Sequence, residues 1–139
     1  MPAKQNQVSK AEYETLAAFR YALRQFLHFS EEAAQRAGLT PQQHQALLAI
    51  KGFPGRDRLT IGELAERLRV RHHSAVELAD RLMAERLVAR EPGTADRRQV
   101  YLTLTARGEK VLEKLSAAHK EQLRRVGPQM GELLRRLHG

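Results

Sequence analysis

Apolar residues recur every three or four positions over most of the chain, which is the period of an amphipathic helix. The longest such stripe covers residues 16–37. Ser9 and Glu12 precede it with the spacing of a capping box, and Gly38 follows it as a typical helix-ending residue. This narrow stripe on an otherwise polar helix is typical of helices that pair with another helix.

Two further helical regions are predicted nearer the middle and the end of the chain. Thr40 and Pro41 open a second helix that runs to about Lys51. Thr105 can cap a last long helix, which we expect to break at 127–128, a Gly-Pro pair, before a terminal apolar segment.

The strongest pattern lies between residues 60 and 82. Thr60 and Glu63 form another capping box, and the apolar positions of 61–68 and of 75–82 have the same spacing of i, i+3, i+4 and i+7. Only residues 69–71 separate the two stripes. Two short amphipathic helices joined by such a turn match a helix-turn-helix unit.

After residue 87 the period changes from helix to strand. Residues 88–90 are short and extended, 91–94 are a cluster of turn residues, and 99–104 alternate between polar and apolar. We therefore expect a β-hairpin, or wing, beside the helix-turn-helix.

The predicted fold is mainly α with a small β-hairpin. A winged helix-turn-helix lobe spans residues 39–105, and the N- and C-terminal helices, 9–38 and 106–138, form a helical dimerisation region within one domain of 1–139. Closed two-fold pairing would duplicate the reading helix, so we expect a homodimer. The alternative is that the end helices only cover the core of their own protomer.

Charge narrows the choice of partner. The chain of 139 residues carries a formal net charge of +8 and has a pI near 10.4, which is typical of a small nucleic-acid-binding domain. Every basic residue between 56 and 106 is Arg, whose planar fork suits phosphates and base edges. The middle of the chain is therefore the expected DNA-binding surface.

Several classes of protein are disfavoured. The chain contains no cysteine, which excludes disulfides, thiolate metal sites and thiol redox sensing. We find no phosphate loop, nucleophile elbow or His-Glu-x-x-His motif, and the six histidines lack the spacing of metal ligands. We expect no enzyme, no cofactor, no metal site and no membrane span, and the polar N-terminus predicts a cytoplasmic protein.

The order of motifs resembles the MarR family of winged helix-turn-helix regulators. The residues that carry this resemblance are Leu64-Ala65, Leu68, Val70, Val76, Asp80-Arg81-Leu82, Leu87-Val88-Ala89-Arg90, Asp96-Arg97-Arg98 and Leu102-Thr103-Leu104-Thr105-Ala106-Arg107-Gly108, with 39–43 as a typical opening. Asp-x-Arg followed by a strand and Leu-Thr-x-x-Gly is the specific part. The resemblance implies dimeric cytoplasmic repressors or activators of transcription, often released by phenolic or other lipophilic ligands.

Three positions depart from the family pattern. Arg71 stands where a Ser or Thr usually caps the recognition helix, and Arg86 replaces a frequent glycine. Glu77 is acidic where the family often has Arg or a neutral polar residue, which changes the expected operator contacts.

The candidate site residues fall into three groups. On the second helix of the helix-turn-helix, the residues expected to face the DNA major groove or its phosphates are His72, His73, Ser74, Glu77 and Arg81. At the wing tip, Asp96 is expected to orient Arg98 for the minor groove, while Arg97 contacts the sugar-phosphate backbone. Phe26, Phe29 and His44 are candidates for a crevice that binds a small aromatic or phenolic ligand, although core packing is the more frequent explanation for such residues.

The leading hypothesis is a DNA-binding transcriptional regulator, most simply a repressor, that binds a pseudo-palindromic operator as a homodimer. The main alternative is a winged-helix module that binds protein or RNA without operator specificity. A third hypothesis is a small ligand-binding protein with a vestigial DNA-binding lobe. Specific DNA binding with a steep dependence on salt would separate the first hypothesis from the others.

Overall fold

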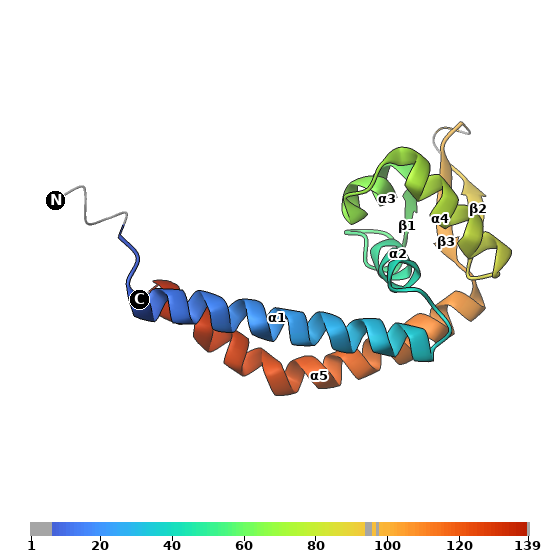
Figure 1. Cartoon of the computed structure of the whole chain (residues 1–139). Coiled ribbons are helices and arrows are strands. Elements are labelled where there is room, and N and C mark those ends of the chain that lie inside the picture. The colour runs from blue at the N-terminus through green and yellow to red at the C-terminus, as the bar shows by residue number, and fades with distance from the viewer. Residues whose placement is uncertain (1–6, 94–95, 97, 139) are drawn as a thin grey trace. The chain divides into compact units, whose positions relative to one another are not determined.

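The computed structural model describes residues 7–93, 96 and 98–138. Within these ranges it contains five helices and one three-stranded antiparallel sheet (Figure 1). The elements are α1 (Lys10–Arg36), α2 (Pro41–Lys51), β1 (Arg58–Thr60), α3 (Ile61–Leu68), α4 (His72–Ala84), β2 (Val88–Pro92), β3 (Val100–Leu104) and α5 (Ala106–His138). The helix-rich class and the hairpin predicted from the sequence are both present.

The chain folds as two compact units. Unit 1 comprises the described parts of residues 1–32 and 117–139, and unit 2 comprises 33–116. Unit 2 is wider than the predicted lobe of 39–105, because it also contains the last turn of α1 and the first turns of α5.

The predicted helix starts are confirmed by their capping bonds. The side chain of Thr40 accepts a hydrogen bond from the Gln43 backbone N–H at 3.1 Å, and the Gln43 side chain accepts one from the Thr40 backbone. Thr60 and Glu63 make the same reciprocal pair at the start of α3, as do Ser9 and Glu12 before α1. These local bonds satisfy N–H groups that a helix start leaves without an intrahelical partner.

Two side-chain contacts join α2 to neighbouring helices of unit 2. The buried Gln43 also donates its side-chain N–H to the Glu85 carboxylate, at 2.9 Å, and Glu85 is the residue that ends α4. At the other end of α2, Lys51 Nζ donates to Glu109 in the first turn of α5, also at 2.9 Å. The hydrogen bond and the charge of Glu109 raise the pKa of Lys51 above its ordinary value. Helix α2 is therefore tied to the end of α4 at one end and to the start of α5 at the other.

The sheet corrects two details of the predicted wing. Strand β1 was not predicted; it pairs with β3 through Leu59 and Leu102, and β3 pairs with β2 to give the order β1-β3-β2. Glu91 and Pro92 were predicted in the turn, but they extend β2 and lie opposite Tyr101 and Val100. Proline is tolerated here because β2 is an edge strand that ends at this residue.

The predicted break in the last helix is wrong. Helix α5 continues for 33 residues with Pro128 inside it. Proline removes one backbone N–H donor and crowds the preceding turn, at about 3 kcal/mol, but this loss is local. Burial of the apolar side chain of Leu133 in the following turns helps to keep the segment after Pro128 helical.

The interior of unit 2 is one cluster of aliphatic side chains. The largest of its fully buried members are Leu47, Ile50, Leu59, Leu64, Leu82, Leu87 and Leu102. They come from α2, β1, α3, α4, the turn before β2, and β3, so the helices and the wing share a single core. Burying a side chain of this size stabilises the fold by about 1.5–3 kcal/mol.

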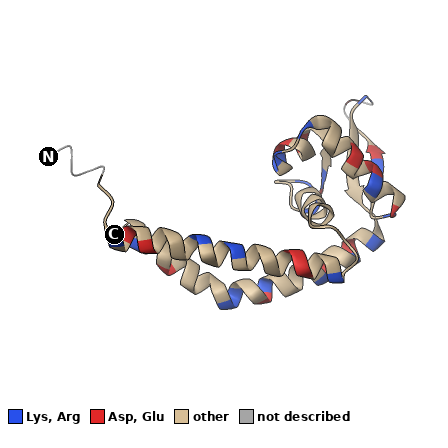
Figure 2. Ribbon diagram, in the orientation of Figure 1, with Lys and Arg blue, Asp and Glu red and all other residues tan. Residues whose placement is uncertain are grey.

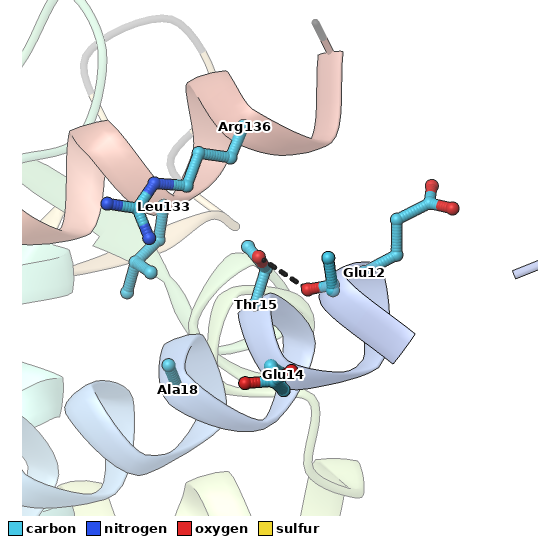
Figure 3. Close-up of a pocket in the computed structure, with 7 residues that line it drawn as sticks. Glu12, Glu14, Thr15, Ala18, Leu133 and Arg136 are labelled. Carbon is cyan, nitrogen blue, oxygen red and sulfur yellow. Dashed lines mark hydrogen bonds between the residues drawn. The ribbon is translucent and has the colours of Figure 1, made fainter. Parts of the chain in front are cut away.

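In unit 1 the described parts of α1 and α5 run side by side (Figure 1). Ser30 Oγ lies 2.8 Å from His119 Nε2, and the rings of Phe26 and Phe29 meet the His119 ring edge-on at 5.9 and 5.4 Å. Nearer the chain ends, a hollow of about 550 Å³ opens between α1 and Leu133 of α5 (Figure 3).

Unit 1 exposes more apolar surface than unit 2. Among the described residues, the large apolar side chains of unit 1 that are at least 43% exposed are Val8, Tyr13, Leu16, Tyr21, Leu27, Leu123 and Leu134. In unit 2 the corresponding residues are Leu48 and Val100. Where such exposed apolar side chains adjoin one another, they mark a contact with another molecule in many soluble proteins.

Three helices end in the same backbone arrangement. In each, a residue one or two positions past the helix end has a positive φ, and the next residue donates back to the last turn: Leu39 N–H to Ala34 O, Val70 N–H to Ala65 O, and Leu87 N–H to Leu82 O. The residue with positive φ is Gly38 (82°) after α1, but it is Arg69 (57°) after α3 and Arg86 (62°) after α4. A side chain in this region costs about 1–2 kcal/mol relative to the right-handed one, whereas glycine bears almost none of that cost.

The base of the wing is held by two turns that touch. Thr105, just before α5, donates its hydroxyl to the Arg86 carbonyl at 2.6 Å and its backbone N–H to the Leu87 carbonyl at 3.1 Å. The same hydroxyl accepts the backbone N–H of Gly108 at 3.1 Å. A β-carbon on Gly108 would lie 2.1 Å from the Leu87 carbonyl oxygen, so only glycine fits at this crossing.

Candidate nucleic-acid interface

Helix α4 has one buried face and one polar face. Ala75, Leu78, Ala79 and Leu82 are buried in the core of unit 2. His72, His73, Glu77 and Arg81 are exposed, and Ser74 is half-buried. The residues predicted to read DNA therefore lie on the solvent side of the helix, as their spacing required.

The start of α4 lacks the usual cap. Arg71 is the N-cap residue, and its side chain forms no capping hydrogen bond. Thr40 and Thr60 do cap α2 and α3, so the departure noted at Arg71 in the sequence is also a structural one. Replacing a good N-cap by a residue that cannot cap typically costs about 0.5–2 kcal/mol.

The arginines of the middle segment do not form a single surface, which corrects the uniform view taken from the sequence. Arg56 forms an ion pair with Glu63, Arg58 lies 3.4 Å from Glu91, and Arg90 lies 3.5 Å from Asp80. These three guanidinium groups are thus largely occupied within unit 2.

Aromatic rings hold some of these guanidinium groups in place. The guanidinium carbons of Arg56 and Arg67 lie 4.2 and 4.8 Å from the centre of the Phe53 ring, and that of Arg58 lies 4.4 Å from the centre of the Tyr101 ring. The contacts of a guanidinium with an aromatic face are favourable because the face carries partial negative charge.

The contacts of Glu63 with Arg56 and Thr60 also affect the pKa of its carboxyl group. Partial burial tends to raise its pKa, but hydrogen bonds from the Thr60 backbone and from Arg56, together with the charge of Arg56, outweigh burial. The pKa of Glu63 is therefore lowered. This carboxylate neutralises Arg56 and at the same time caps α3, so the pair has a structural role.

The remaining exposed arginines carry the positive charge that is open to a partner. They are Arg67, Arg69 and Arg71 around the turn between α3 and α4, Arg81 on α4, and Arg98 in the wing. Arg86 is also exposed, but it follows the other end of α4, away from that turn. Figure 2 shows Lys and Arg in blue on α3, on α4 and on the wing. The sequence analysis did not name Arg67 or Arg69 as candidates and named Arg71 only as an unusual cap, although their alternate spacing was visible.

The wing tip is ordered by a backbone contact. The Asp96 carboxylate accepts a hydrogen bond from the backbone N–H of Arg98 at 2.9 Å. The sequence predicted that Asp96 would orient the Arg98 guanidinium, whereas the contact observed orients the backbone of the loop. Arg97 lies outside the described residues.

The three candidate ligand-binding residues lie in different units. His44 is buried in unit 2, at 2% exposure, with its Nδ1 3.5 Å from the Gln45 side chain. Phe26 and Phe29 belong to unit 1 and contact His119. His119 was missed by the sequence analysis, although it continues the stripe of Leu115 by one helical turn. The crevice that would unite Phe26, Phe29 and His44 remains a prediction.

Two further classes of site were searched for in the described ranges. No group of three or more His, Asp or Glu side chains there could hold a metal ion. No helix there is both long and apolar enough to span a membrane.

Known proteins with similar sequences or structures agree with the winged helix-turn-helix arrangement described above. The model of the MarR family matches residues 37–99, from the end of α1 to the wing. The HTH-type transcriptional repressor MdtR of Bacillus subtilis (strain 168) is 35% identical over 89 residues. The structure of a MarR family protein from Bacillus stearothermophilus superimposes with a TM-score of 0.78, at 23% identity, over 95% of this chain and 96% of that one. Over its middle part this chain is therefore similar to the MarR family.

The matches cover different shares of the chains, and the structural ones have low sequence identity, so the structural ones support a conclusion about the fold alone. The match to MdtR covers 64% of this chain. On the other side it covers 56% of the length of that repressor, so this chain spans little more than half of it. The F27L mutant of MepR from S. aureus, solved bound to an oligodeoxyribonucleotide, has a TM-score of 0.67 at 18% identity, over 94% of this chain and 96% of that one. These structural likenesses establish the MarR-type winged helix-turn-helix fold for this chain.

Proposed function

We propose that this protein is a MarR-family, sequence-specific DNA-binding transcriptional repressor that acts as a homodimer on a pseudo-palindromic operator. The observation that carries the proposal is the exposed polar face of α4 next to a hairpin wing that carries Arg98. Both elements are anchored in one core, so they can be presented to DNA together. The repressor MdtR and the DNA-bound MepR mutant support the same conclusion.

The chemistry of α4 suits the major groove. His72, His73 and Ser74 occupy the first turn, the part of a recognition helix that approaches base edges. Glu77 can accept a hydrogen bond from the exocyclic amine of cytosine, and Arg81 one turn later can contact a phosphate. Arg98 would enter the minor groove from the wing, with Arg97 on the adjacent backbone.

Dimerisation through unit 1 follows from its exposed apolar residues. Leu16 is 44% exposed and Leu134 43%, although both lie on predicted apolar stripes. A second copy of the chain, related by a two-fold axis, would cover such surface and place two α4 helices on one face of the DNA.

The wing provides a direct test on operator fragments selected from genomic DNA. Arg98→Ala should weaken operator binding by about 5–150-fold, which corresponds to about 1–3 kcal/mol for a specific base contact. Arg97→Ala should have a smaller effect, and Asp96→Ala should lie between them because it loosens the backbone of Arg98. Fluorescence anisotropy at fixed salt measures all three.

The matched control is Arg90→Ala. Arg90 lies on the same hairpin but near Asp80, so its loss should change affinity little. Unaltered binding by all three wing-tip variants would show that the wing does not read DNA. If the protein selects no DNA sequence, the alternative of a winged-helix module for protein or RNA takes precedence.

We further propose that a small aromatic acid or phenol releases the protein from its operator. The supporting features are the aromatic cluster of Phe26 and Phe29 around His119 and the buried imidazole of His44. A ligand that prefers one conformation typically changes affinity by about 5–150-fold.

A panel of aromatic acids titrated into the protein–operator complex tests this control. At least one should lower operator affinity for the wild type and do so less for His44→Ala, while the ligand-free variant still binds DNA. Equal operator affinity with every compound would leave a constitutive DNA-binding protein.

A further inference from the structure

The turn between α3 and α4 contains two residues that its backbone disfavours. Arg69 occupies a position with φ of 57°, and Arg71 occupies an N-cap position without capping. The same chain uses Gly38 at the equivalent place after α1 and Thr40 and Thr60 at the equivalent place before α2 and α3. Residues that oppose the local backbone preference in this way tend to be kept for function.

The arginine side chains at this turn share one property: each carries a positive charge that is exposed to solvent and is not paired with any described carboxylate. Arg67, Arg69 and Arg71 are all exposed, and in the part of the chain that the structure describes none of them forms an ion pair. Arg67 is further oriented by the Phe53 ring at 4.8 Å. Arg56, which lies 4.2 Å from the centre of the same ring, is instead neutralised by Glu63.

The turn directly precedes the helix proposed to enter the major groove. When the first turn of a recognition helix approaches base edges, the residues before it lie close to the phosphates that border the groove. Arginine suits this place because its fork binds phosphate oxygens in a bidentate manner. Three such groups lie within five residues, so this turn concentrates positive charge of the kind that binds phosphates.

We infer that Arg67, Arg69 and Arg71 form a phosphate clamp, which binds the DNA backbone beside the groove entered by α4. The clamp rests on the proposed DNA-binding function and adds to it a sequence-independent part of the affinity. The clamp also explains why arginine stands at positions 69 and 71. Glycine at 69 and serine at 71 would make the helix ends more stable, but they would not bring positive charge to the DNA surface.

The test uses two substitutions that should move stability and binding in opposite directions. Arg69→Gly suits the positive φ, and Arg71→Ser supplies a cap, so each should raise the thermal midpoint by about 1–4 °C. Each should also remove two phosphate contacts from a DNA-bound dimer. The slope of log affinity against log salt should then become shallower by about 1.8, and affinity at 0.15 M salt should fall by roughly 30-fold.

The affinity loss should be the same for the selected operator and for random duplex DNA, because phosphates carry no sequence information. Arg67→Gln, which changes no helix end, should reduce the salt slope without raising the midpoint. Arg69→Asn provides a second residue compatible with positive φ and should behave like Arg69→Gly.

Arg86→Gly is the matched control. It relieves the same positive φ and removes the same charge at the other end of α4, so it should raise the midpoint with an unchanged salt slope. If the wild type binds DNA and the Arg69 and Arg71 variants retain its salt slope, the clamp is wrong while the proposed function stands. If the wild type binds neither operator nor random DNA, the proposed function itself fails.

Discussion

Five base pairs inserted at the centre of the operator should reduce the affinity of this protein to the level of random DNA. In a two-fold dimer, the α4 helices must reach two half-sites whose centres lie about 34–36 Å apart, or roughly ten base pairs. Five base pairs correspond to half a helical turn, so the insertion moves one half-site to the opposite face of the duplex. Only one α4 helix and one wing can then bind specifically.

The expected change is large because specific contacts are lost on one whole half-site. Specific operators are typically bound at least about 10³-fold more tightly than random DNA, and this difference should largely disappear. Electrophoretic mobility shift at fixed salt measures the change. Substitution of the central base pairs without a change in length is the control and should preserve most of the binding. Equal affinity for the lengthened operator would contradict a two-fold dimer with this spacing.

Gly108→Ala should strongly destabilise the folded protein. The added β-carbon would lie 2.1 Å from the Leu87 carbonyl oxygen and 3.1 Å from its carbon, both backbone atoms that no rotamer change can move. Relief requires the start of α5 to move away from the turn before β2. Thr105 would then lose its short bond to the Arg86 carbonyl.

Overpacking against backbone commonly costs about 1–3 kcal/mol, and the broken bonds of Thr105 should bring the loss to about 3 kcal/mol. For a protein of this size the thermal midpoint should fall by about 6–12 °C. Gly131→Ala, in the same helix, would bring the new carbon only to the flexible end of the Arg135 side chain, at 3.6 Å, and should stabilise by up to about 1 kcal/mol. A wild-type midpoint for Gly108→Ala would show that the two turns do not touch in solution.

The predicted features that the structure confirmed depend on local interactions. The capping pairs at Ser9, Thr40 and Thr60 join residues only three positions apart, so their spacing was sufficient to place the helix starts. The polar face of α4 followed from its apolar stripe in the same way, because helical periodicity fixes which residues share a face.

The errors occurred where distant residues decide. Strand β1 has three residues, too few to show alternation, and it exists because β3 offers it a pairing edge. Pro128 was expected to end a helix, but packing in unit 1 stabilises the residues that follow it. One further difference is local, because the Asp96 carboxylate accepts the backbone N–H of Arg98, only two positions away, where a contact with the guanidinium was predicted.

The amino-acid sequence by itself determined the helices, the wing, the basic charge and the family signature, because periodicity, caps and composition are properties of neighbouring residues. Only the tertiary structure decided which arginines are available to DNA. Arg58 pairs with Glu91, 33 positions away, and Arg90 lies near Asp80 on another element, whereas in the described residues Arg69 and Arg98 form no ion pair. It also explained the glycine of the Leu-Thr-x-x-Gly pattern: Gly108 must be small because α5 begins against the Leu87 carbonyl, a contact that forms only when the two turns cross.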